Sequence, residues 1–163
     1  MIEENIMQEI QFPSHINEFF EFAIKRAQEM LLKDCYHSPM CFIITEQGIA
    51  PCICNYKTDD EKTQWFEKLR EVLGELNAEA IIFVSEAWIK DVNEGNLDLP
   101  VRKYQDKREI LVISLASRYG NKMATIELER DADNKIILGK REIKTEYCDN
   151  LIAPYFEQFA TIH

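Results

Sequence analysis

The sequence AIIFVSEAWI at residues 80–89 decides the fold, because it has the composition of a strand at the centre of a sheet. β-branched and aromatic residues dominate the run, and apolar residues occupy both faces of the strand up to Val84. Ser85 and Glu86 then mark the point where the strand leaves the core. A carboxylate at that point needs a partner, so Glu86 is the first candidate for a functional side chain.

Two amphipathic helices are predicted before this strand. The first follows Pro13-Ser14, which offers an N-terminal cap, and should end near Asp34. The second opens with Thr58-Asp-Asp-Glu61, a capping box in which each side chain accepts a hydrogen bond from the other residue's backbone N–H. Apolar residues recur at helical spacing in both segments, and we expect these stripes to pack on the sheet: Ile16, Phe19, Phe20, Ala23, Ile24, Ala27, Met30 and Leu31 in the first, and Trp65, Phe66, Leu69, Val72, Leu73 and Leu76 in the second.

Short β-prone runs predict the remaining strands. Gly48, which can adopt positive φ, joins two of them in a hairpin before the second helix. A long connection at residues 90–107 separates the central strand from the last ones. A short helix is expected from Pro154 onward, since proline is tolerated in a first turn. The expected strands, besides the central one, lie at residues 40–45, 49–56, 109–117, around 124–128 and at 135–144.

This element order predicts an α+β fold with a single, mostly antiparallel β-sheet of five to six strands. Two long helices and a short C-terminal helix should pack on that sheet. The chain length fits a single domain over residues 1–163, in which residues 1–12 form a loosely ordered N-terminal extension. The order of elements resembles the profilin-like and roadblock-like architectures. That likeness implies a fold and no function, because one fold hosts unrelated activities.

The chain is acidic, with a formal net charge of −10. Such a surface repels phosphate backbones, which argues against nucleic acid as a partner, and only the cluster RKYQDKR at residues 102–108 is basic. No apolar run approaches the roughly 20 residues needed to span a bilayer, so no membrane partner is expected. The first residues, MIEENIMQEIQF, carry acids where a signal peptide carries bases. We therefore expect a cytoplasmic protein.

The chain contains five cysteines, an odd number that does not suit a disulfide framework. Reduced thiols are therefore expected. Cys41, Cys52 and Cys54 fall on neighbouring predicted strands, near Cys35 and His37, and four such ligands could hold zinc. The spacing is not the paired C-x₂-C of a zinc knuckle, and thiols on strands commonly serve as small buried apolar groups. The sequence thus predicts no metal site, and with no glycine-rich phosphate loop it predicts no cofactor.

Glu86 has a predicted partner in Arg108. If the strands on either side of the long connection pair antiparallel, residues near 108–110 lie opposite Glu86, and a charge-assisted pair can satisfy the carboxylate there. Such a pair can simply fix the strand register. The alternative is a small-molecule site roofed by residues 90–107, a length of connection that is often functional. The candidate ligand-binding residues of that site are Glu86, Trp88, Arg102 and Arg108.

Three segments together resemble a family of small bacterial proteins of unassigned function: HSPMCFII at 37–44, AEAIIFVSEAW at 78–88 and DKREILVIS at 106–114. The family pattern is an "APM" strand start, an "FVSEAW" strand and, after a variable loop, an Arg-Glu pair that opens the next strand. The likeness covers about residues 16–117. The chain departs from the pattern before Arg108, where LPVRKYQDKR replaces a proline-rich approach, so the place of Arg102 in the pattern is not fixed. The resemblance implies the fold and an interest in Glu86, and carries no activity.

Two classes of function remain open. The first is a non-catalytic cytoplasmic binding or assembly module, which acts on a protein partner or by self-association. The second is a small-molecule-binding protein or small enzyme with its site around Glu86 and the 90–107 connection. No serine or cysteine has a recognisable catalytic base beside it, so the catalytic residues are unknown and the sequence leaves open whether the chain is an enzyme.

Overall fold

A six-stranded sheet organises the part of the chain that the structure describes, residues 12–89, residues 108–145 and Phe156 of a computed structural model. The strand order is β2-β1-β3-β4-β5-β6, and each neighbouring pair is antiparallel. The central position of β3 agrees with its two apolar faces. The elements are α2 (Ser14–Asp34), β1 (Met40–Thr45), β2 (Gly48–Ile53), α3 (Asp59–Glu75), β3 (Ala80–Ile89), β4 (Arg108–Ser117), β5 (Gly120–Arg130) and β6 (Ile136–Lys144).

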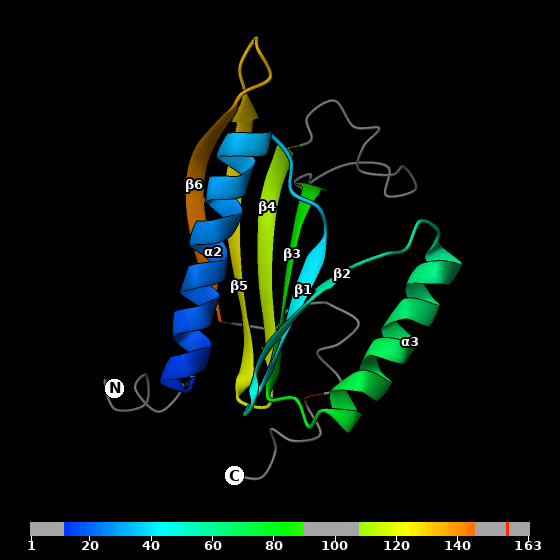
Figure 1. Ribbon diagram of the computed structural model, residues 1–163. Helices are drawn as coiled ribbons and strands as arrows, with labels where there is room; N and C mark the ends of the chain where they lie inside the picture. Colours follow the sequence, from blue (N-terminus) through cyan, green and yellow to red (C-terminus); the bar gives the residue numbers. More distant parts are fainter. Residues whose placement is uncertain (1–11, 90–107, 146–155, 157–163) are drawn as a thin grey trace, which may run out of the picture.

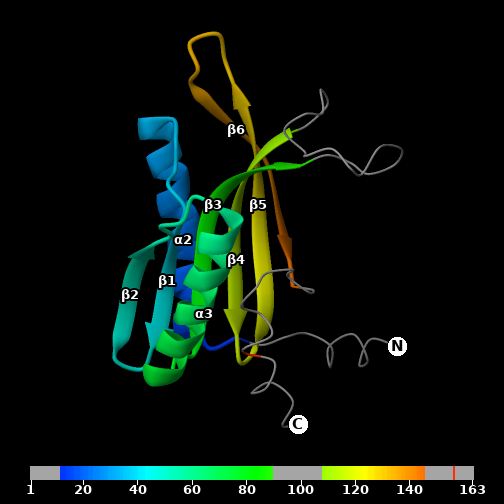
Figure 2. The same ribbon diagram turned by 90° about the vertical axis from the view of Figure 1, so that its right-hand side faces the viewer.

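The helices α2 and α3 lie on opposite faces of the sheet (Figure 1, Figure 2). We call these the α2 face and the α3 face. On β3, Ile82 and Val84 point to the α2 face, while Ile81 and Phe83 point to the α3 face. The alternation of side chains along a strand thus explains why β3 is apolar at consecutive positions.

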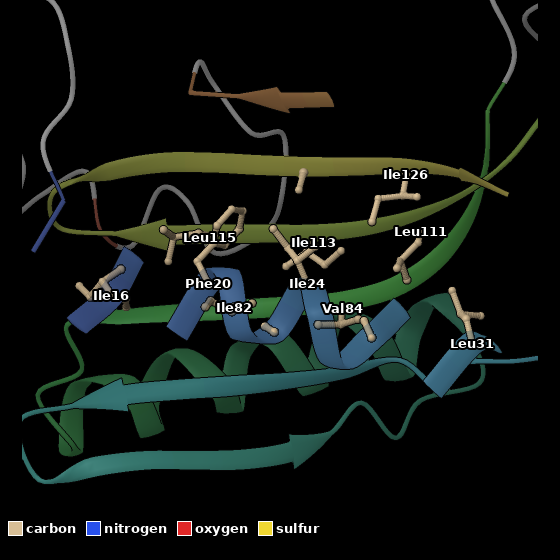
Figure 3. Packing of buried hydrophobic residues seen from close by; sticks show 14 of the residues in the cluster. Ile16, Phe20, Ile24, Leu31, Ile82, Val84, Leu111, Ile113, Leu115 and Ile126 are labelled. Atoms are coloured by element: carbon tan, nitrogen blue, oxygen red, sulfur yellow. The ribbon is translucent and has the colours of Figure 1, made fainter. Parts of the chain in front are cut away.

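The core on the α2 face is the larger of the two in the described residues, and Figure 3 shows part of its packing. Ile16, Phe20, Ile24 and Leu31 recur along one side of α2 and are almost completely buried. They pack on side chains from the middle of the sheet, among them Ile82, Val84, Leu111, Ile113, Leu115 and Ile126.

The core on the α3 face joins Phe66, Leu69 and Leu73 of α3 to the sheet. Their partners are Cys41, Ile43, Ala78, Ile81, Ala116 and Phe156. Val72 and Leu76 were expected in the same stripe but are exposed, so that part of the prediction is wrong. The buried residues of α3 recur every three or four positions. The buried side of the helix is therefore narrower than the number of its apolar residues suggests.

The ends of the helices follow the sequence signals in part. Thr58 Oγ1 accepts from the Glu61 N–H at 3.1 Å, while the Glu61 carboxylate accepts from the Lys57 N–H, one residue before the expected donor. Ser14 is not a cap, because α2 begins at that residue and its N-cap, Pro13, makes no side-chain hydrogen bond. The helix ends through Cys35, whose positive φ of 60° lets its N–H bind the Leu31 carbonyl.

The predicted fold class is confirmed as an α+β arrangement with one antiparallel sheet and two long helices in the described residues. The strand predictions hold to within a few residues. The largest differences are that β5 begins at Gly120, four residues before the expected start, and that β2 ends at Ile53 rather than Tyr56. The predicted C-terminal helix lies outside the described residues except for Phe156, which is buried. The N-terminal segment 1–11 and the connection 90–107 also lie outside them.

Candidate functional site

Glu86 has an arginine partner, and that partner is Arg130 at the end of β5. Arg130 Nη2 donates to Glu86 Oε1 at 3.3 Å. The two side chains are 26% and 18% exposed, so water competes only partly for the charges. The other oxygen of Glu86 accepts from the backbone N–H of His37 at 3.4 Å. Both oxygens of the carboxylate are therefore hydrogen-bonded.

The predicted pair between Glu86 and Arg108 is wrong. In the β3–β4 register Glu86 lies opposite Leu111, and Arg108 lies opposite Ile89. Opposite residues of an antiparallel pair share a face, and the face alternates along each strand. Glu86 therefore points to the α2 face and Arg108 to the α3 face. On that face Arg108 Nη1 donates to Glu127 Oε1 at 2.7 Å.

Arg130 also forms hydrogen bonds with groups other than Glu86. Its Nε and Nη2 form a bidentate pair with the Glu109 carboxylate at 3.0 and 2.8 Å, and its Nη1 donates to the Cys35 carbonyl at 3.0 Å. Hydrogen bonds to Glu109 raise the pKa of the Arg130 guanidinium, so the group stays charged. We call Glu86, Glu109 and Arg130 the Arg130 cluster. It ties the C-terminal end of α2 to three neighbouring strands.

The geometry of the Arg130 cluster suits a structural clamp. An arginine and a backbone N–H each donate to one oxygen of Glu86, and these two hydrogen bonds orient the carboxylate. A bidentate arginine pair also fixes geometry more strongly than a single contact. The register role that the sequence suggested for Glu86 therefore has support, with a different arginine.

Arg130 was missed although the sequence contained a signal for it. Ala124, Ile126 and Leu128 alternate on the buried face of β5, and Arg130 continues that series by two residues. A cation on the buried face at the end of a strand calls for an acidic partner. Glu109 has the matching position, because its strand places it opposite Leu128.

Two of the four predicted ligand-binding residues cannot be placed in a site. Arg102 lies in the connection outside the described residues, and so does the roof that was expected to cover the site. The backbone of Trp88 belongs to β3, directly opposite Glu109. The side chains of both residues lie outside the described part of the structure, and their ligand-binding role remains a prediction.

A pocket of about 280 Å³ lies on the α2 face beside the Arg130 cluster. α2, β1, β3 and the segment before β1 form its walls. The sequence did not single it out, because each wall comes from a different element. The lining is almost entirely apolar and consists of Phe22, Ala23, Arg26, Met30, His37, Met40, Phe42 and Val84, a set that we call the apolar groove.

A row of aromatic residues lies at the apolar groove, and one of them is exposed. Phe22 is 56% exposed although it projects from a helix with a well-filled core below it. Phe19 lies between Phe22 and Phe42, with ring centroids 5.7 and 5.2 Å away. An exposed phenylalanine within an aromatic row is a feature of interaction surfaces rather than of ordinary solvent-facing helix positions.

His37 is the buried polar residue in the lining of the groove, which also includes the exposed Arg26. Its side chain is 3% exposed, and Nδ1 lies 2.8 Å from the Ser38 carbonyl oxygen. Because a carbonyl only accepts, Nδ1 must carry the proton, which leaves Nε2 as an acceptor in the neutral ring. Among the described residues no hydrogen bond to Nε2 is found, and Nε2 is not one of their fully buried unpaired atoms. Since the His37 backbone also binds Glu86, the groove and the Arg130 cluster are adjacent.

The edge strand β2 extends the apolar surface. Pro51 and Ile53 lie opposite Phe42 and Met40, so they share the α2 face with the groove. Ile53 is 69% exposed, and Ile49 on the same face is also exposed. We call Ile49, Pro51 and Ile53 the β2 shelf. Pro51 has no N–H to donate, which disfavours the addition of another strand at this edge.

A thiol cluster lies on the opposite face. Cys41 and Cys52 are directly opposed, and Cys54 follows two residues later on the same face. A hydrogen bond with Cys54 and burial raise the pKa of the Cys41 thiol, while the same hydrogen bond lowers the pKa of Cys54. Within the described ranges, no group of three or more His, Cys, Asp or Glu side chains is arranged to hold a metal ion.

No helix of residues 12–89 and 108–145 combines the length and apolar character that a membrane crossing requires.

Comparison with known proteins places the chain in a family. No curated protein and no solved structure matches it. The model of the family described as bacteriophage lambda protein ea47 matches residues 3–161. The expected kinship with a small family of unassigned function is confirmed at that level, and membership itself brings no activity to the chain. The chain belongs to the bacteriophage lambda protein ea47 family.

Proposed function

We propose that this chain is a non-catalytic binding or assembly module that acts in the cytoplasm. The observation that carries the proposal is the continuous apolar surface formed by the apolar groove and the β2 shelf. Scattered apolar residues are normal on a protein surface, but a pocket bordered by Phe22 and Ile53 on one face is a gathered patch. Such patches mark interaction sites, so we infer a protein partner at this surface.

The Arg130 cluster supports a binding role over a catalytic one. Its carboxylates are held by an arginine, and the groove beside it contains one imidazole, to which no nucleophile or titratable side chain of residues 12–89 and 108–145 is hydrogen-bonded. General acid–base chemistry needs a group within reach of the proton it moves. The odd cysteine count and the acidic net charge support a reducing compartment and a partner other than nucleic acid.

A small-molecule-binding role is the second candidate. The pocket favours it, because a volume of about 280 Å³ lies close to the range of known ligand sites, and His37, which lines the pocket, binds Glu86 through its backbone N–H. This differs from the site expected around Glu86 itself, where Arg130 already occupies the carboxylate. We also propose that the FVSEAW pattern marks the family because its glutamate anchors this clamp. The likeness of element order to profilin-like and roadblock-like folds stays a proposal.

In the test, short random peptides displayed on yeast are selected for binding to the folded full chain. The selected peptides are then tested for binding to two variants of the chain. Phe22→Glu places a charge in the groove, whereas Leu32→Glu changes another exposed apolar residue of α2 outside it. We expect peptides that bind the wild type and the Leu32→Glu variant but do not bind the Phe22→Glu variant. Peptides that bind all three proteins equally, or no selected peptides at all, would contradict the proposal.

A further inference from the structure

The size of the pocket limits what can fill it. Pockets that enclose drug-sized ligands span roughly 300–1,000 Å³. The apolar groove, at about 280 Å³, is at the small end of that range. It suits one large side chain rather than an extended molecule. Met30 and Met40 in its walls favour an aromatic occupant, because thioether sulfur makes favourable contacts with ring edges.

His37 Nε2 specifies the polar chemistry of the occupant. The side chain is more than nine-tenths buried, lines the pocket, and offers an acceptor that has no partner among the described residues. Nε2 is not one of the fully buried side-chain atoms that lack a partner in the described residues, so solvent reaches it, and an occupant with a single donor can replace that water. Indole N–H is a donor only, whereas a phenol also carries an acceptor that would itself need a partner. The lone acceptor therefore matches a tryptophan better than a tyrosine.

The β2 shelf indicates that the occupant is part of a larger partner. A free small molecule in the pocket would leave Ile49 and Ile53 as exposed as before. A chain segment that inserts one side chain and lies across the shelf covers both surfaces. Pro51 disfavours the pairing of that segment with the β2 edge as an added strand. Contact through side chains, as with an amphipathic helix, remains.

Arg26 favours a negative charge on the partner, close to the side chain that fills the groove. It lines the mouth of the groove and is paired with Glu29 at 3.3 Å, both side chains being largely exposed. Exposed pairs of this kind contribute little to stability, so an incoming carboxylate can compete for the guanidinium. A carboxylate close to the anchor on the partner is thus complementary to this edge of the groove.

We propose that the partner anchors a tryptophan side chain in the apolar groove, with its indole N–H donating to His37 Nε2 and a neighbouring carboxylate on Arg26. The inference rests on the proposed binding function and names the chemistry of the partner. Tryptophan is the residue type most enriched at the energetic centres of protein interfaces. The β2 shelf then excludes water around the anchor.

The first experiment compares indole with 1-methylindole on the full chain, with affinities from chemical-shift titration and the His37 ring nitrogens observed directly. The two probes have the same aromatic system, but only indole has the donor. We expect indole to bind roughly fivefold to tenfold more tightly, the net worth of one hydrogen bond, and to shift Nε2. Equal affinities, or a His37 signal that indole leaves unchanged, would overturn the proposal.

The second experiment uses the peptides selected on the wild-type protein. Peptides that depend on Phe22 should contain a tryptophan with Asp or Glu nearby, and replacing it with 1-methyltryptophan should weaken binding by the same factor as for the free probes. Removing the guanidinium with Arg26→Gln should weaken peptides with the acidic residue more than those without it. His37→Phe, once shown to fold, should abolish the difference between the two tryptophan forms.

The outcomes separate this inference from the proposed function. Peptides that depend on Phe22 but show no preference for tryptophan would overturn the anchor and leave the binding module standing. Indole binding without any tryptophan peptide would identify a small-molecule pocket and overturn the inference. The chain could instead dimerise reversibly, in a way that Phe22→Glu abolishes and that prevents indole binding. That result would assign the groove to a second copy of the chain and would overturn the inference.

Discussion

Arg130 on β5 donates from Nη2 to Oε1 of Glu86 on β3 at 3.3 Å, a contact that passes across the intervening strand β4. The arginine reaches across because Glu109 of β4 accepts on the same side and completes the cluster. The C-terminal end of α2 joins through the Cys35 carbonyl. One guanidinium thus holds three strands and a helix in one relative arrangement.

The first prediction concerns the cost of removing this guanidinium. Arg130→Met should lower the free energy of unfolding by about 1.5–3 kcal/mol, because hydrogen bonds to charged groups are lost and two carboxylates remain half-buried without their cation. Arg108→Met is the matched control, since its pair with Glu127 is exposed and should contribute about 0–1 kcal/mol. Urea unfolding measures both. Equal losses would show that the Arg130 cluster is not the stronger of the two.

A double-mutant cycle tests which arginine serves Glu86. Glu86→Gln and Arg130→Met should couple, because the second change costs less once the carboxylate is neutral. Glu86→Gln and Arg108→Met should be additive, since the register places the two side chains on opposite faces of the sheet. Unfolding free energies of the wild type, the three single variants and the two double variants decide the matter. Coupling to Arg108 in place of Arg130 would refute the register.

The third prediction concerns the two cores. Ile24→Ala on α2 and Leu69→Ala on α3 should each cost about 2–5 kcal/mol, because each leaves a cavity in a separate buried cluster. Val72→Ala is the control on α3, where the side chain is exposed and the loss should be small. Thermal and urea unfolding provide the comparison. Negligible losses at both buried positions would refute this packing of the helices on the sheet.

Thiol reactivity should differ within the thiol cluster. Cys54 has a lowered pKa and is partly exposed, so its thiolate should be alkylated by iodoacetamide well before Cys41, which is buried and has a raised pKa. Peptide mass spectrometry after short exposure gives the order. Cys54→Ser is the control that assigns the fast reaction. Faster labelling of Cys41 in the folded protein would contradict the placement of the cluster.

Alkaline pH should destabilise the fold. In the folded state, thiol hydrogen bonding and burial raise the pKa of Cys41 above 9.0, and burial raises that of Tyr56 above 10.0. The unfolded chain therefore loses these protons first, so their contribution is full below about pH 9 and falls as pH rises further. The pKa of Cys54 is lowered in the folded state, so below about pH 9 its contribution to folding stability increases as the pH rises. Unfolding free energies measured with reductant from neutral to alkaline pH should fall less steeply for Cys41→Val and Tyr56→Phe than for the wild type.

The sequence by itself determined the elements and the class of the fold. Helical spacing from Ile16 to Leu31 and alternation from Ala124 to Leu128 predicted which residues are buried. The structure buries them at those periods, except that Phe19 and Met30 are half-buried. The reason is that these patterns are local: a helix or strand segregates its apolar side chains before it meets any other element. The turn residues and the Thr58–Glu61 signal are local in the same sense.

The tertiary structure alone decided the partners. Glu86 and Arg108 were matched on the assumption that the strand ends align, and a small difference in register places Arg108 on the other face. A strand that is apolar on both faces does not reveal which face its first charged residue takes. The apolar groove could not be predicted from the sequence either. Its walls come from Phe22, His37, Phe42 and Val84 on four different segments, and only the packing of α2 across β1 and β3 brings them together.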